Sequence, residues 1–380
     1  MIDLHAVRAF LEPGHLERAR ALARSCEARI APLAEAADDA AARGQARDLL
    51  ALLGREWFAA IGDQDLRSCA LARELLAAAS PLADAVFALQ ALGGTPLVLA
   101  GTDAQRRRWL EPALDGTQMA AFAMTESEAG SDVAAMTTSA RRDGDHYVIS
   151  GHKTFISNAG IADFYVVFAS TDAAAGRRGI SCFVVPADAK GFRFVRPQVL
   201  SAPHPLGEIA FDACRIPADH RLGAEGHGYK LGLATLDRLR PTVAAAACGM
   251  ASRALHEALA HARVRTQFGK PIGEFQLVQE KLARMAIQLT AARLLVYRAA
   301  WERDRGAARI TVEAAMAKAF ATEAAQRIVD DAVQILGGRG VLAEHPVDRL
   351  YRSVRALRIY EGTTEIQHLI IAGALLEEKA

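Results

Sequence analysis

The sequence lacks the marks of membrane, secreted and nucleic-acid-binding proteins. No run of about 18 apolar residues occurs in the chain, so we expect no membrane-spanning helix. The formal net charge of the 380 residues is +1, which argues against a dedicated binder of nucleic acids or other polyanions. The first residues do not resemble a signal peptide. These absences predict a cytoplasmic protein with neither a membrane span nor a nucleic-acid partner.

Cysteine is also sparse. The five cysteines lie far apart and form no Cys-x-x-Cys pair, which excludes a disulfide framework and a zinc-binding spacing. We therefore expect reduced thiols and no metal site. What is present is ordinary for a globular protein, with 51% apolar and 23% charged residues. A chain of 380 residues exceeds the size at which one core keeps growing, so two or three domains are expected.

Residues 4–118 have the pattern of packed helices. Ala, Leu, Arg and Glu dominate this region, and apolar residues recur at helical spacing. The Gly-Gly-Thr-Pro stretch at 93–96 is expected to interrupt the helical run. A short polar helix over 104–110 should follow, capped by Thr102 or Asp103.

The pattern changes to short strands at about residue 119. Asp143-Gly144-Asp145 is typical of a hairpin turn. Short β-rich runs bounded by turn residues are expected over 146–151, 165–169, 180–185, 192–195 and 208–211. Several short strands at close spacing predict a small β sandwich or barrel covering 119–225.

Helices return after about residue 226. Four long helices are expected over 229–262, 275–303, 312–336 and 364–379. Pro241 should lie in or near a kink, because proline removes a helical donor. Short links between the helices predict an antiparallel bundle. The chain is therefore expected to be an α+β multidomain protein, with a helical domain at 1–118, a β domain at 119–225 and a four-helix bundle at 226–380.

One carboxylate draws attention near the C-terminus. Glu361 precedes Gly-Thr-Thr and a largely apolar run. Thr364 with Gln367 three residues later predicts a capping box at a helix start. Glu361 would then lie before the first turn, where anions are favoured. A lone glutamate at a turn is usually solvated; the alternative is a general base held at a cofactor.

Two earlier segments could hold a flat ligand. Residues 121–132 mix an apolar entry with Thr, Ser and Gly, and so offer hydroxyls and backbone N–H groups to an acceptor-rich ligand. Phe155 and Ser157 would share one face of a strand, where the ring could cover a heterocycle while the hydroxyl bonds its edge. Each segment alone is weak, because surface loops rich in Ser and Gly are common.

Taken together, the motifs are far more specific. In order, they are Thr125-Glu126-x-x-Ala129-Gly130-Ser131-Asp132, Gly151-x-Lys153-x-Phe155-Ile156-Ser157-Asn158, Asp237-Arg238-x-Arg240-Pro241, Arg265-x-Gln267-Phe268-Gly269-Lys270-Pro271-Ile272, Gln334-x-Leu336-Gly337-Gly338-x-Gly340 and Tyr360-Glu361-Gly362-Thr363. With these motifs the chain closely resembles the acyl-CoA dehydrogenase family, from about residue 80 to the C-terminus. That family has the same order of helical domain, β domain and four-helix bundle. The resemblance implies FAD as the cofactor.

The resemblance also implies which residues contact FAD. Thr125 would lie near the pyrimidine side of the flavin and Ser131 at the pyrophosphate or substrate side, while Phe155 and Ser157 flank the isoalloxazine. The family usually has Trp and Thr at the last two positions, so the aromatic ring and the hydroxyl are both kept. The full implied set is Phe122, Met124, Thr125, Gly130, Ser131, Phe155, Ile156, Ser157, Arg265, Gln267, Phe268, Gln276, Gln334, Gly338, Thr363 and Glu365.

Part of this set implies an oligomer. Arg265, Gln267 and Phe268, with Gln334 and Gly338, would meet the FAD diphosphate of a neighbouring subunit, and arginine suits this as a permanent charge with forked donors. A cofactor shared between chains requires at least a dimer. Because the family is commonly tetrameric, a homotetramer built as a dimer of dimers is expected.

The implied reaction is α,β-dehydrogenation of an acyl-CoA thioester to the trans-2-enoyl-CoA, with hydride passing to the flavin N5. Glu361 matches the family's base, which removes the α proton, and its own N–H would bond the thioester carbonyl. A second family position for the base matches Leu239, which cannot accept a proton. The implied substrate contacts are Ser131, Asp237, Arg240, Tyr360 and Gly362.

Two departures from the family pattern leave the substrate open. Many members carry Gly-x-Arg-x-Ser-x-Thr where this chain has residues 200–207, and here His204 lies between two prolines and is expected to be a surface loop residue. The usual Gly- and Pro-bearing loop of the N-terminal domain is replaced by residues 60–65. An acyl-CoA oxidase, a dehydrogenase of carrier-protein-bound acyl groups and a non-catalytic flavoprotein therefore remain as alternatives. For a dehydrogenase, the expected electron acceptor is an electron-transfer flavoprotein.

Overall fold

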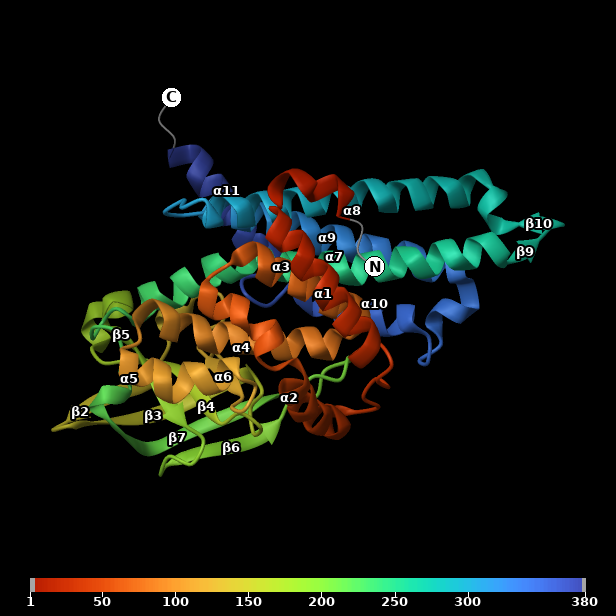
Figure 1. The fold of residues 1–380 in the computed structure, drawn as a ribbon. Helices are drawn as coiled ribbons and strands as arrows, with labels where there is room; N and C mark the ends of the chain where they lie inside the picture. The colour runs from red at the N-terminus through yellow and green to blue at the C-terminus, as the bar shows by residue number, and fades with distance from the viewer. Residues whose placement is uncertain (1–3, 378–380) are drawn as a thin grey trace. The chain divides into compact units, whose positions relative to one another are not determined.

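The structure, a computed structural model, describes residues 4–377 and divides by internal packing into two compact units (Figure 1). Unit 1 takes Met1–Leu33, Asp65–Asp84 and Asp237–Ala380, and unit 2 takes Ala34–Gln64 and Ala85–Leu236. The expected mixture of helical and β parts is confirmed. The boundaries expected near residues 118 and 225 remain predictions.

Unit 1 is helical. Its elements are η1 (His5–Phe10), α1 (Pro13–Arg29), α3 (Leu66–Ala79), most of α7 (Gly228–Val264), α8 (Gln276–Asp304), α9 (Thr311–Leu336), α10 (Pro346–Leu357) and α11 (Thr364–Glu377). Helices α8, α10 and α11 all pack on α9, and α3 packs on α8. Buried side chains of α7, α8, α9 and α10 form one apolar cluster, which is the core of this unit.

Small side chains set how closely the helices of unit 1 approach. Residues 244–247 of α7 are all alanine and fully buried. A Cβ added at Gly249, one turn away, would lie 2.2 Å from the carbonyl oxygen of Glu74 in α3. The backbones of α7 and α3 therefore cross in direct contact, and any larger residue at Gly249 would force them apart.

The long helices expected in the C-terminal region are confirmed to within two residues where the structure describes them. Helix α7 continues through Pro241. The last helix is described to Glu377, so its expected end at residue 379 lies outside the described residues. Helix α10 was not expected from the sequence. It has Pro346 in its first turn and buries Val347, Leu350, Val354 and Leu357 at helical spacing, on an otherwise charged segment.

Unit 2 contains one eight-stranded sheet. Its strands are β1 (Ala120–Ala123), β2 (Ser139–Asp143), β3 (His146–Ser157), β4 (Phe164–Ser170), β5 (Ile180–Pro186), β6 (Phe192–Pro197), β7 (Leu206–Pro217) and β8 (Arg221–Leu222). The order is β6-β7-β3-β2-β4-β5-β8, and β1 pairs parallel to β4 off this path. The hairpin expected at Gly144 is present, because Asp143 pairs with His146 across the turn.

Unit 2 also contains helices, one of which packs on the first strand of the sheet. They are α2 (Asp39–Asp63), most of α4 (Pro81–Ala100), α5 (Asp103–Gln105), a π-helical turn (Arg106–Leu110) and α6 (Glu111–Leu114). The break expected at 93–96 is wrong, because α4 runs through it. A Cβ at Gly93 would lie 2.4 Å from the Cβ of Ala120, so this glycine lets α4 pack directly on β1. Thr102 forms the expected cap, in a reciprocal box with Gln105.

Helix α4 is also the one helix among residues 4–377 that is long and apolar enough to cross a membrane by length and composition. Within the protein, 83% of its apolar window is buried. Its buried Gln90 donates to the carbonyl oxygens of Ala113 and Gln118 and accepts from the N–H of Ala120. Such burial and side-chain bonding is what a core helix shows.

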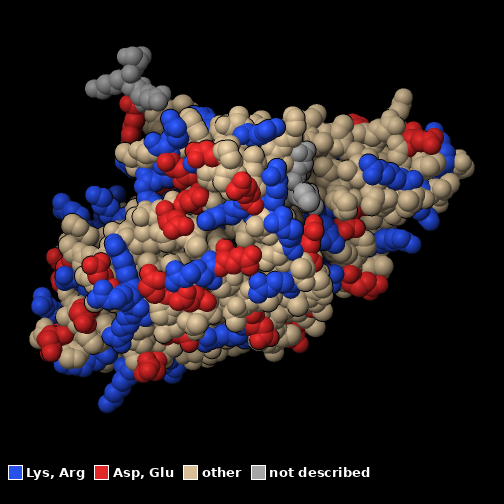
Figure 2. All heavy atoms as spheres, viewed as in Figure 1, with Lys and Arg blue, Asp and Glu red and all other residues tan. Residues whose placement is uncertain are grey.

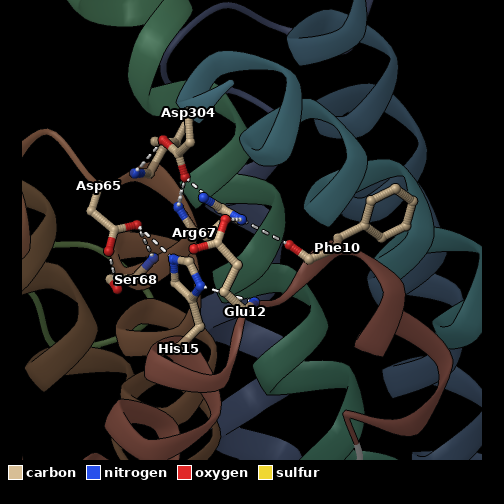
Figure 3. Close-up of polar contacts among 8 residues, drawn as sticks. Phe10, Glu12, His15, Asp65, Arg67, Ser68 and Asp304 are labelled. Carbon is tan, nitrogen blue, oxygen red and sulfur yellow. Dashed lines mark hydrogen bonds and ion pairs between the residues drawn. The ribbon is translucent and has the colours of Figure 1, made fainter. Parts of the chain in front are cut away.

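A polar joint in unit 1 ties α1, α3 and the end of α8 together (Figure 3). Asp304 accepts from the N–H groups of Leu66 and Arg67 at 2.9 and 3.0 Å and from Arg67 Nε at 2.8 Å. His15 Nε2 lies 3.3 Å from Asp65 Oδ1, while its Nδ1 accepts from the N–H of Glu12. Burial alone would raise the pKa of Asp65, but bonds from His15 and Ser68 bring it below its ordinary value. His15, Asp65 and Asp304 are close enough to ligate a metal, yet these side chains already take part in polar contacts within the protein.

The surface charges and the cysteines agree with the composition. Figure 2 shows basic and acidic side chains interspersed over the visible face, as a net charge of +1 suggests. All five cysteines are free and buried. Burial raises the pKa of Cys26 and of Cys214 to about 11, and that of the other three further still.

Candidate active site

The turn between α10 and α11 places Glu361 in a strained backbone conformation. Glu361 has φ +56° and Gly362 has φ +92°. A non-glycine residue in the left-handed region costs about 1–3 kcal/mol and persists where surrounding contacts enforce it, often at functional sites. Gly362 cannot take a side chain easily, since a Cβ there would lie 2.6 Å from Gln367 Nε2.

The cap of α11 differs from the expected one. The hydroxyl of Thr363 accepts from the N–H of Ile366 at 3.3 Å, so the cap lies one residue earlier than predicted. The hydroxyl of Thr364 instead donates to Glu323 Oε1, and the Gln367 amide donates to the carbonyl oxygen of Gly362 at 3.0 Å. The capping box of Thr364 and Gln367 is therefore wrong, because both side chains are used to hold the preceding turn.

Two cations hold the carbonyl oxygens of this turn. Arg240 Nε donates to the carbonyl of Glu361 at 3.1 Å, and Lys318 Nζ donates to that of Gly362 at 2.7 Å. Arg240 is itself fixed by Asp237, whose Oδ1 accepts from Arg240 Nη1 at 2.6 Å. The N–H of Glu361 donates to no acceptor within residues 4–377. The turn thus brings the predicted substrate contacts Asp237, Arg240 and Gly362 to the predicted base.

The surroundings of the Glu361 carboxyl group raise its pKa. Its Oε2 atom is buried and has no hydrogen-bond partner among the described residues. Burial raises the pKa of Glu361 above its ordinary value, while the charges of Arg73, Arg240 and Lys318 oppose this rise. Burial exceeds their effect, which leaves a carboxylate more basic than a free glutamate. Burial also lowers the pKa of Lys318 to about 8.

The sequence did not reveal a buried ion pair near this base. Arg73 of α3 is 1% exposed and donates to both oxygens of Asp84, at 2.8 and 2.9 Å. Its remaining nitrogen donates to Thr242 at 3.1 Å. Because Asp84 neutralises Arg73, this arginine stabilises the ionised Glu361 less than a free cation would. The available signal was an arginine inside an otherwise apolar helix face.

In unit 2, the predicted flavin contacts Phe155 and Ser157 lie at the end of β3. Phe155 is 60% exposed and has φ +55°, at a register shift between β3 and β7. Ile156 is buried, and Ser157 is partly exposed. The exposed ring of Phe155 and the partly exposed Ser157 lie on either side of buried Ile156, and their shared contact with a flavin stays a prediction.

The other predicted flavin segment joins the same strand. The carbonyl oxygen of Thr125 accepts from the N–H of Thr154 at 3.1 Å, which links the segment to β3. A second link is made by the fully buried Lys153 of β3, which donates to Glu126 of this segment at 2.9 Å. Phe122 is half-buried and Met124 buried, whereas Gly130 and Ser131 are exposed. A Cβ at Gly130 would meet nothing within 4 Å, so a ligand can approach this backbone.

His204 is not a simple surface loop residue. Its Nε2 lies 2.7 Å from Ser157 Oγ. Burial lowers the pKa of His204 to about 4, so the ring is neutral at physiological pH. His204 does lie in a loop, as expected, and is half-buried, but its contact with Ser157 was not predicted, because the loop sequence does not show which strand the loop covers.

A third group of predicted contacts lies around the hairpin of β9 (Thr266–Gln267) and β10 (Lys270–Pro271) in unit 1. Arg265, Gln267, Phe268, Gln276, Gln334 and Gly338 are all exposed. Burial lowers the pKa of His261, and the charges of Arg339, Arg265 and His345 lower it further. This end of unit 1 therefore concentrates positive charge, which suits an anionic group such as a diphosphate. Thr363 and exposed Glu365 lie apart from this group, at the N-terminus of α11.

The residues fit a flavin dinucleotide in their chemistry. Unit 2 offers an exposed ring at Phe155, a hydroxyl at Ser157 and open backbone at Gly130. Unit 1 offers forked cationic donors at Arg265 and a buried carboxylate oxygen without a partner at Glu361. An aromatic cover, edge donors, cations and a base are what an isoalloxazine, a diphosphate and an acidic C–H require.

Comparisons with known proteins identify the family. Models of the acyl-CoA dehydrogenase N-terminal, middle and C-terminal domains match residues 13–117, 121–214 and 226–376. The chain belongs to the acyl-CoA dehydrogenase family. The short-chain specific acyl-CoA dehydrogenase of Megasphaera elsdenii is 40% identical over 327 residues, 84% of this chain and 85% of that protein. The structure of butyryl-CoA dehydrogenase from the same organism matches with a TM-score of 0.90 at 36% identity, covering 97% of this chain and 99% of that one.

Another relative of this acyl-CoA dehydrogenase family member is named for a complex. The caffeyl-CoA reductase-Etf complex subunit CarC of Acetobacterium woodii is 40% identical over 294 residues, 76% of each chain. Family membership confirms the expected three-part fold, FAD as the cofactor and an oxidoreductase activity. The reaction is the FAD-dependent dehydrogenation of an acyl-CoA.

Proposed function

We propose that Glu361 is the general base of this dehydrogenation and removes the α proton of the acyl-CoA thioester. The observation that carries this assignment is the buried, unpartnered Oε2 of Glu361 on a backbone held in the left-handed region. A buried polar oxygen without a partner is rare and needs an explanation. A substrate C–H presented to that oxygen supplies one, and Leu239, at the alternative position of the base, cannot accept a proton.

The backbone around Glu361 supports the same step. The α proton of a thioester becomes acidic only when donors stabilise the charge that develops on its carbonyl oxygen. The free N–H of Glu361 is one such donor, and Arg240 and Lys318 keep the turn in place by binding its carbonyl oxygens. Asp237, Arg240, Tyr360 and Gly362 would shape the substrate side in unit 1, and Ser131 would do so in unit 2. FAD supplies the acceptor for the hydride that leaves the β carbon.

We assign FAD contacts to residues in each of the two units. Phe122, Met124, Thr125, Gly130 and Ser131, with Phe155, Ile156 and Ser157, would contact the flavin. Arg265, Gln267, Phe268, Gln276, Gln334 and Gly338 would meet the diphosphate of a neighbouring subunit, and Thr363 and Glu365 that of their own chain. The positive charge around Arg265 and His261 supports the diphosphate assignment.

This arrangement requires an oligomer, which we propose to be a tetramer made of two dimers. Large apolar side chains are exposed around the hairpin and on α8: Phe268 is 94% exposed, Leu277 80% and Ile287 69%. Such exposure favours burial against another chain. The proposed electron acceptor is an electron-transfer flavoprotein, supported by the relative named as a subunit of an Etf complex. We further propose that the enzyme works in the cytoplasm.

Anaerobic flavin bleaching tests the proposed function. The purified holoenzyme should be yellow, and an acyl-CoA that fits the site should bleach it in the absence of oxygen. A panel of short, long, branched and cyclic acyl-CoAs identifies the acyl group that the enzyme accepts. Carrier-protein thioesters test whether the acyl carrier is CoA or a protein. Enoyl thioesters with the reduced enzyme test the reverse direction, since one relative is named a reductase. Failure of every thioester to bleach the flavin would contradict the proposal, and rapid peroxide formation on turnover would indicate an oxidase.

Arg265→Ala tests the diphosphate assignment separately. Loss of a permanent cation at this exposed end should weaken FAD binding, measured as flavin content after gel filtration and as the apparent Kd of the apoprotein. Arg141→Ala, which removes an exposed arginine of β2 in the other unit, is the matched control. Equal FAD content in both variants would refute the role of Arg265.

A further inference from the structure

We infer that His204 is a positioning residue for the flavin, which acts by fixing the hydroxyl of Ser157. The inference rests on the proposed function, in that it takes the flavin to lie at Phe155 and Ser157. The juxtaposition behind it is the 2.7 Å contact between His204 Nε2 and Ser157 Oγ. This is the single hydrogen bond that the Ser157 hydroxyl makes within residues 4–377.

The backbone that carries Ser157 is strained and needs support. Phe155, two residues before it, has φ +55°, and Asn158, directly after it, has φ +63°. Phe155 is bulky, so its conformation must be enforced by its surroundings, whereas asparagine adopts a positive φ more readily. We call residues 198–206 the covering segment, because this one stretch of chain supplies the enforcing contacts.

The covering segment bonds both strained residues. Gln198 Oε1 accepts from the N–H of Phe155 at 2.8 Å, and the carbonyl oxygen of Pro205 accepts from the N–H of Asn158 at 2.9 Å. The Gln198 amide also donates to Thr154 Oγ1 at 2.9 Å. His204 lies between these contacts, so its ring is held over Ser157 by the same segment that shapes the Ser157 backbone.

Helix α2 anchors the covering segment to the turn it covers. Arg43 donates to the carbonyl oxygen of Ala159 at 2.7 Å and to that of Leu206 at 2.6 Å. Its Nε donates to Asp39 at 2.6 Å, which fixes the guanidinium. One arginine therefore joins the end of the strand that bears Ser157 to the end of the segment that bears His204. Prolines on both sides of His204 remove further backbone freedom.

The chemistry of a neutral imidazole suits this task. The charges nearest to His204 are those of Asp39, which raises its pKa, and Arg43, which lowers it, and burial outweighs both. A neutral ring has one nitrogen that donates and one that accepts. Nε2 can therefore hold the Ser157 hydroxyl in one of two senses: as donor to Oγ, leaving the hydroxyl proton for a flavin acceptor, or as acceptor, leaving Oγ lone pairs for a flavin donor. In either sense no net charge is brought to the flavin.

Serine needs such a restraint more than threonine does. A serine hydroxyl can occupy three staggered positions, whereas the extra methyl of threonine restricts χ1. The contact with His204 removes this freedom from Ser157 without a methyl group. It follows that the effects of His204 and Ser157 on flavin binding should depend on each other. A threonine at position 157 should make His204 unnecessary.

A double-mutant cycle on the holoenzyme tests the inference. The variants are His204→Phe, Ser157→Ala and the double substitution, and the readouts are the apparent Kd of FAD, the visible absorption maximum of bound flavin and its midpoint potential. We expect His204→Phe to weaken FAD binding by about 3- to 10-fold, the range for loss of one hydrogen bond. In the Ser157→Ala background the same substitution should have no further effect. Ser157→Thr combined with His204→Phe should restore the wild-type values.

The controls separate this result from loss of folding. His152→Phe changes an exposed histidine of the same strand and should leave all three readouts unchanged. If His204→Phe does not fold, His204→Gln is measured instead; because glutamine keeps a donor and an acceptor, it should lose less than half of the FAD-binding free energy that Ser157→Ala loses, and an equal loss would count against the inference. Additive effects of the two single substitutions, or a His204→Phe enzyme with wild-type Kd, spectrum and potential, would overturn the inference.

The failure of this inference differs from failure of the proposed function. A wild-type protein that binds no FAD, or that no thioester bleaches, refutes the proposed function itself. A wild-type protein that binds FAD and is bleached, together with His204→Phe enzyme that shows no change in the flavin, refutes the positioning role of His204 alone.

Discussion

The turn at Glu361 and the turn from Phe155 to Asn158 both hold non-glycine residues at positive φ, but they are held by different groups. Two cations, Arg240 and Lys318, bind the carbonyl oxygens of the first. Neutral groups from the covering segment bind the N–H groups of the second. The first turn is thus held at its carbonyl oxygens by charged donors, and the second at its N–H groups by neutral acceptors, although Arg43 also binds the carbonyl oxygen of Ala159 just after it. Strain alone does not distinguish a catalytic turn from a binding turn; the groups that hold it do.

The largest expected effect is that of Glu361→Gln, which tests whether the charged turn moves the proton. Glutamine keeps the shape of the side chain but cannot accept a proton. The rate of anaerobic bleaching should fall by at least about 10²–10⁴-fold, the usual contribution of a general base, with FAD content unchanged. Glu257→Gln removes a carboxylate of α7 that pairs with Arg253 and should keep the wild-type rate. A Glu361→Gln enzyme whose flavin is still bleached at the wild-type rate would show that Glu361 is not the general base.

Arg240→Gln tests whether a cation is needed to hold the charged turn. Loss of a hydrogen bond from a charged donor costs about 1.5–3 kcal/mol, which corresponds to about a 10- to 100-fold lower rate of bleaching. Arg240→Lys should recover part of the rate, because the charge remains. Gln198→Leu makes the corresponding change in the neutral turn and should alter FAD affinity while leaving the bleaching rate of the FAD-loaded enzyme closer to wild type. Equal losses of rate in both variants would show that the two turns are not functionally distinct.

Gly362→Ala measures how much of the charged turn depends on glycine. A side chain at φ +92° and 2.6 Å from Gln367 Nε2 should lower the free energy of unfolding by about 1–3 kcal/mol, measured by urea denaturation. Gly373→Ala is the control, since its Cβ would meet nothing within 4 Å in the middle of α11. That substitution should raise stability by about 0.5–1 kcal/mol. Equal stabilities of the two variants would indicate a turn that relaxes freely.

The smallest expected effect is on the pH dependence of stability, and it tests the neutral turn. The folded pKa of His204, about 4, lies below the value of 6.5 for an exposed histidine, so the folded state binds fewer protons than the unfolded state between these values. Stability should therefore decrease as pH falls from 6.5 towards 4. His204→Gln should flatten this part of the curve, measured by urea denaturation at several pH values. An unchanged slope would mean that His204 titrates normally in the folded protein.

Much of the architecture could be predicted because it follows from local pattern. The periodic apolar positions of α8 and α9, and the hairpin at Gly144, are visible in the sequence and were found in the structure. The continuation of α4 through residues 93–96 could not be predicted, because Gly93 indicates a break until its close packing against Ala120 is known. Glycine in a helix is explained by its neighbours in space, which the sequence does not give.

The motifs predicted candidate site residues, but they did not predict the residues that support them. Glu361, Phe155 and Ser157 follow from short patterns with a chemical meaning. Arg73 and His204 do not, since their roles depend on contacts with residues far along the chain, at Asp84 and Ser157. Groups that act on a ligand can be recognised by type and spacing, whereas groups that orient them are defined by tertiary contact alone.

Because every cysteine is buried, the reactivity of its thiol reports whether the surrounding part of the protein has unfolded. Cys26, Cys69 and Cys248 belong to unit 1, and Cys182 and Cys214 to unit 2. Only a thiolate reacts with alkylating reagents, and inaccessible thiols of raised pKa stay protonated in the native state. Identifying which cysteines are labelled first under mild denaturant would therefore show which unit unfolds first, without any introduced probe.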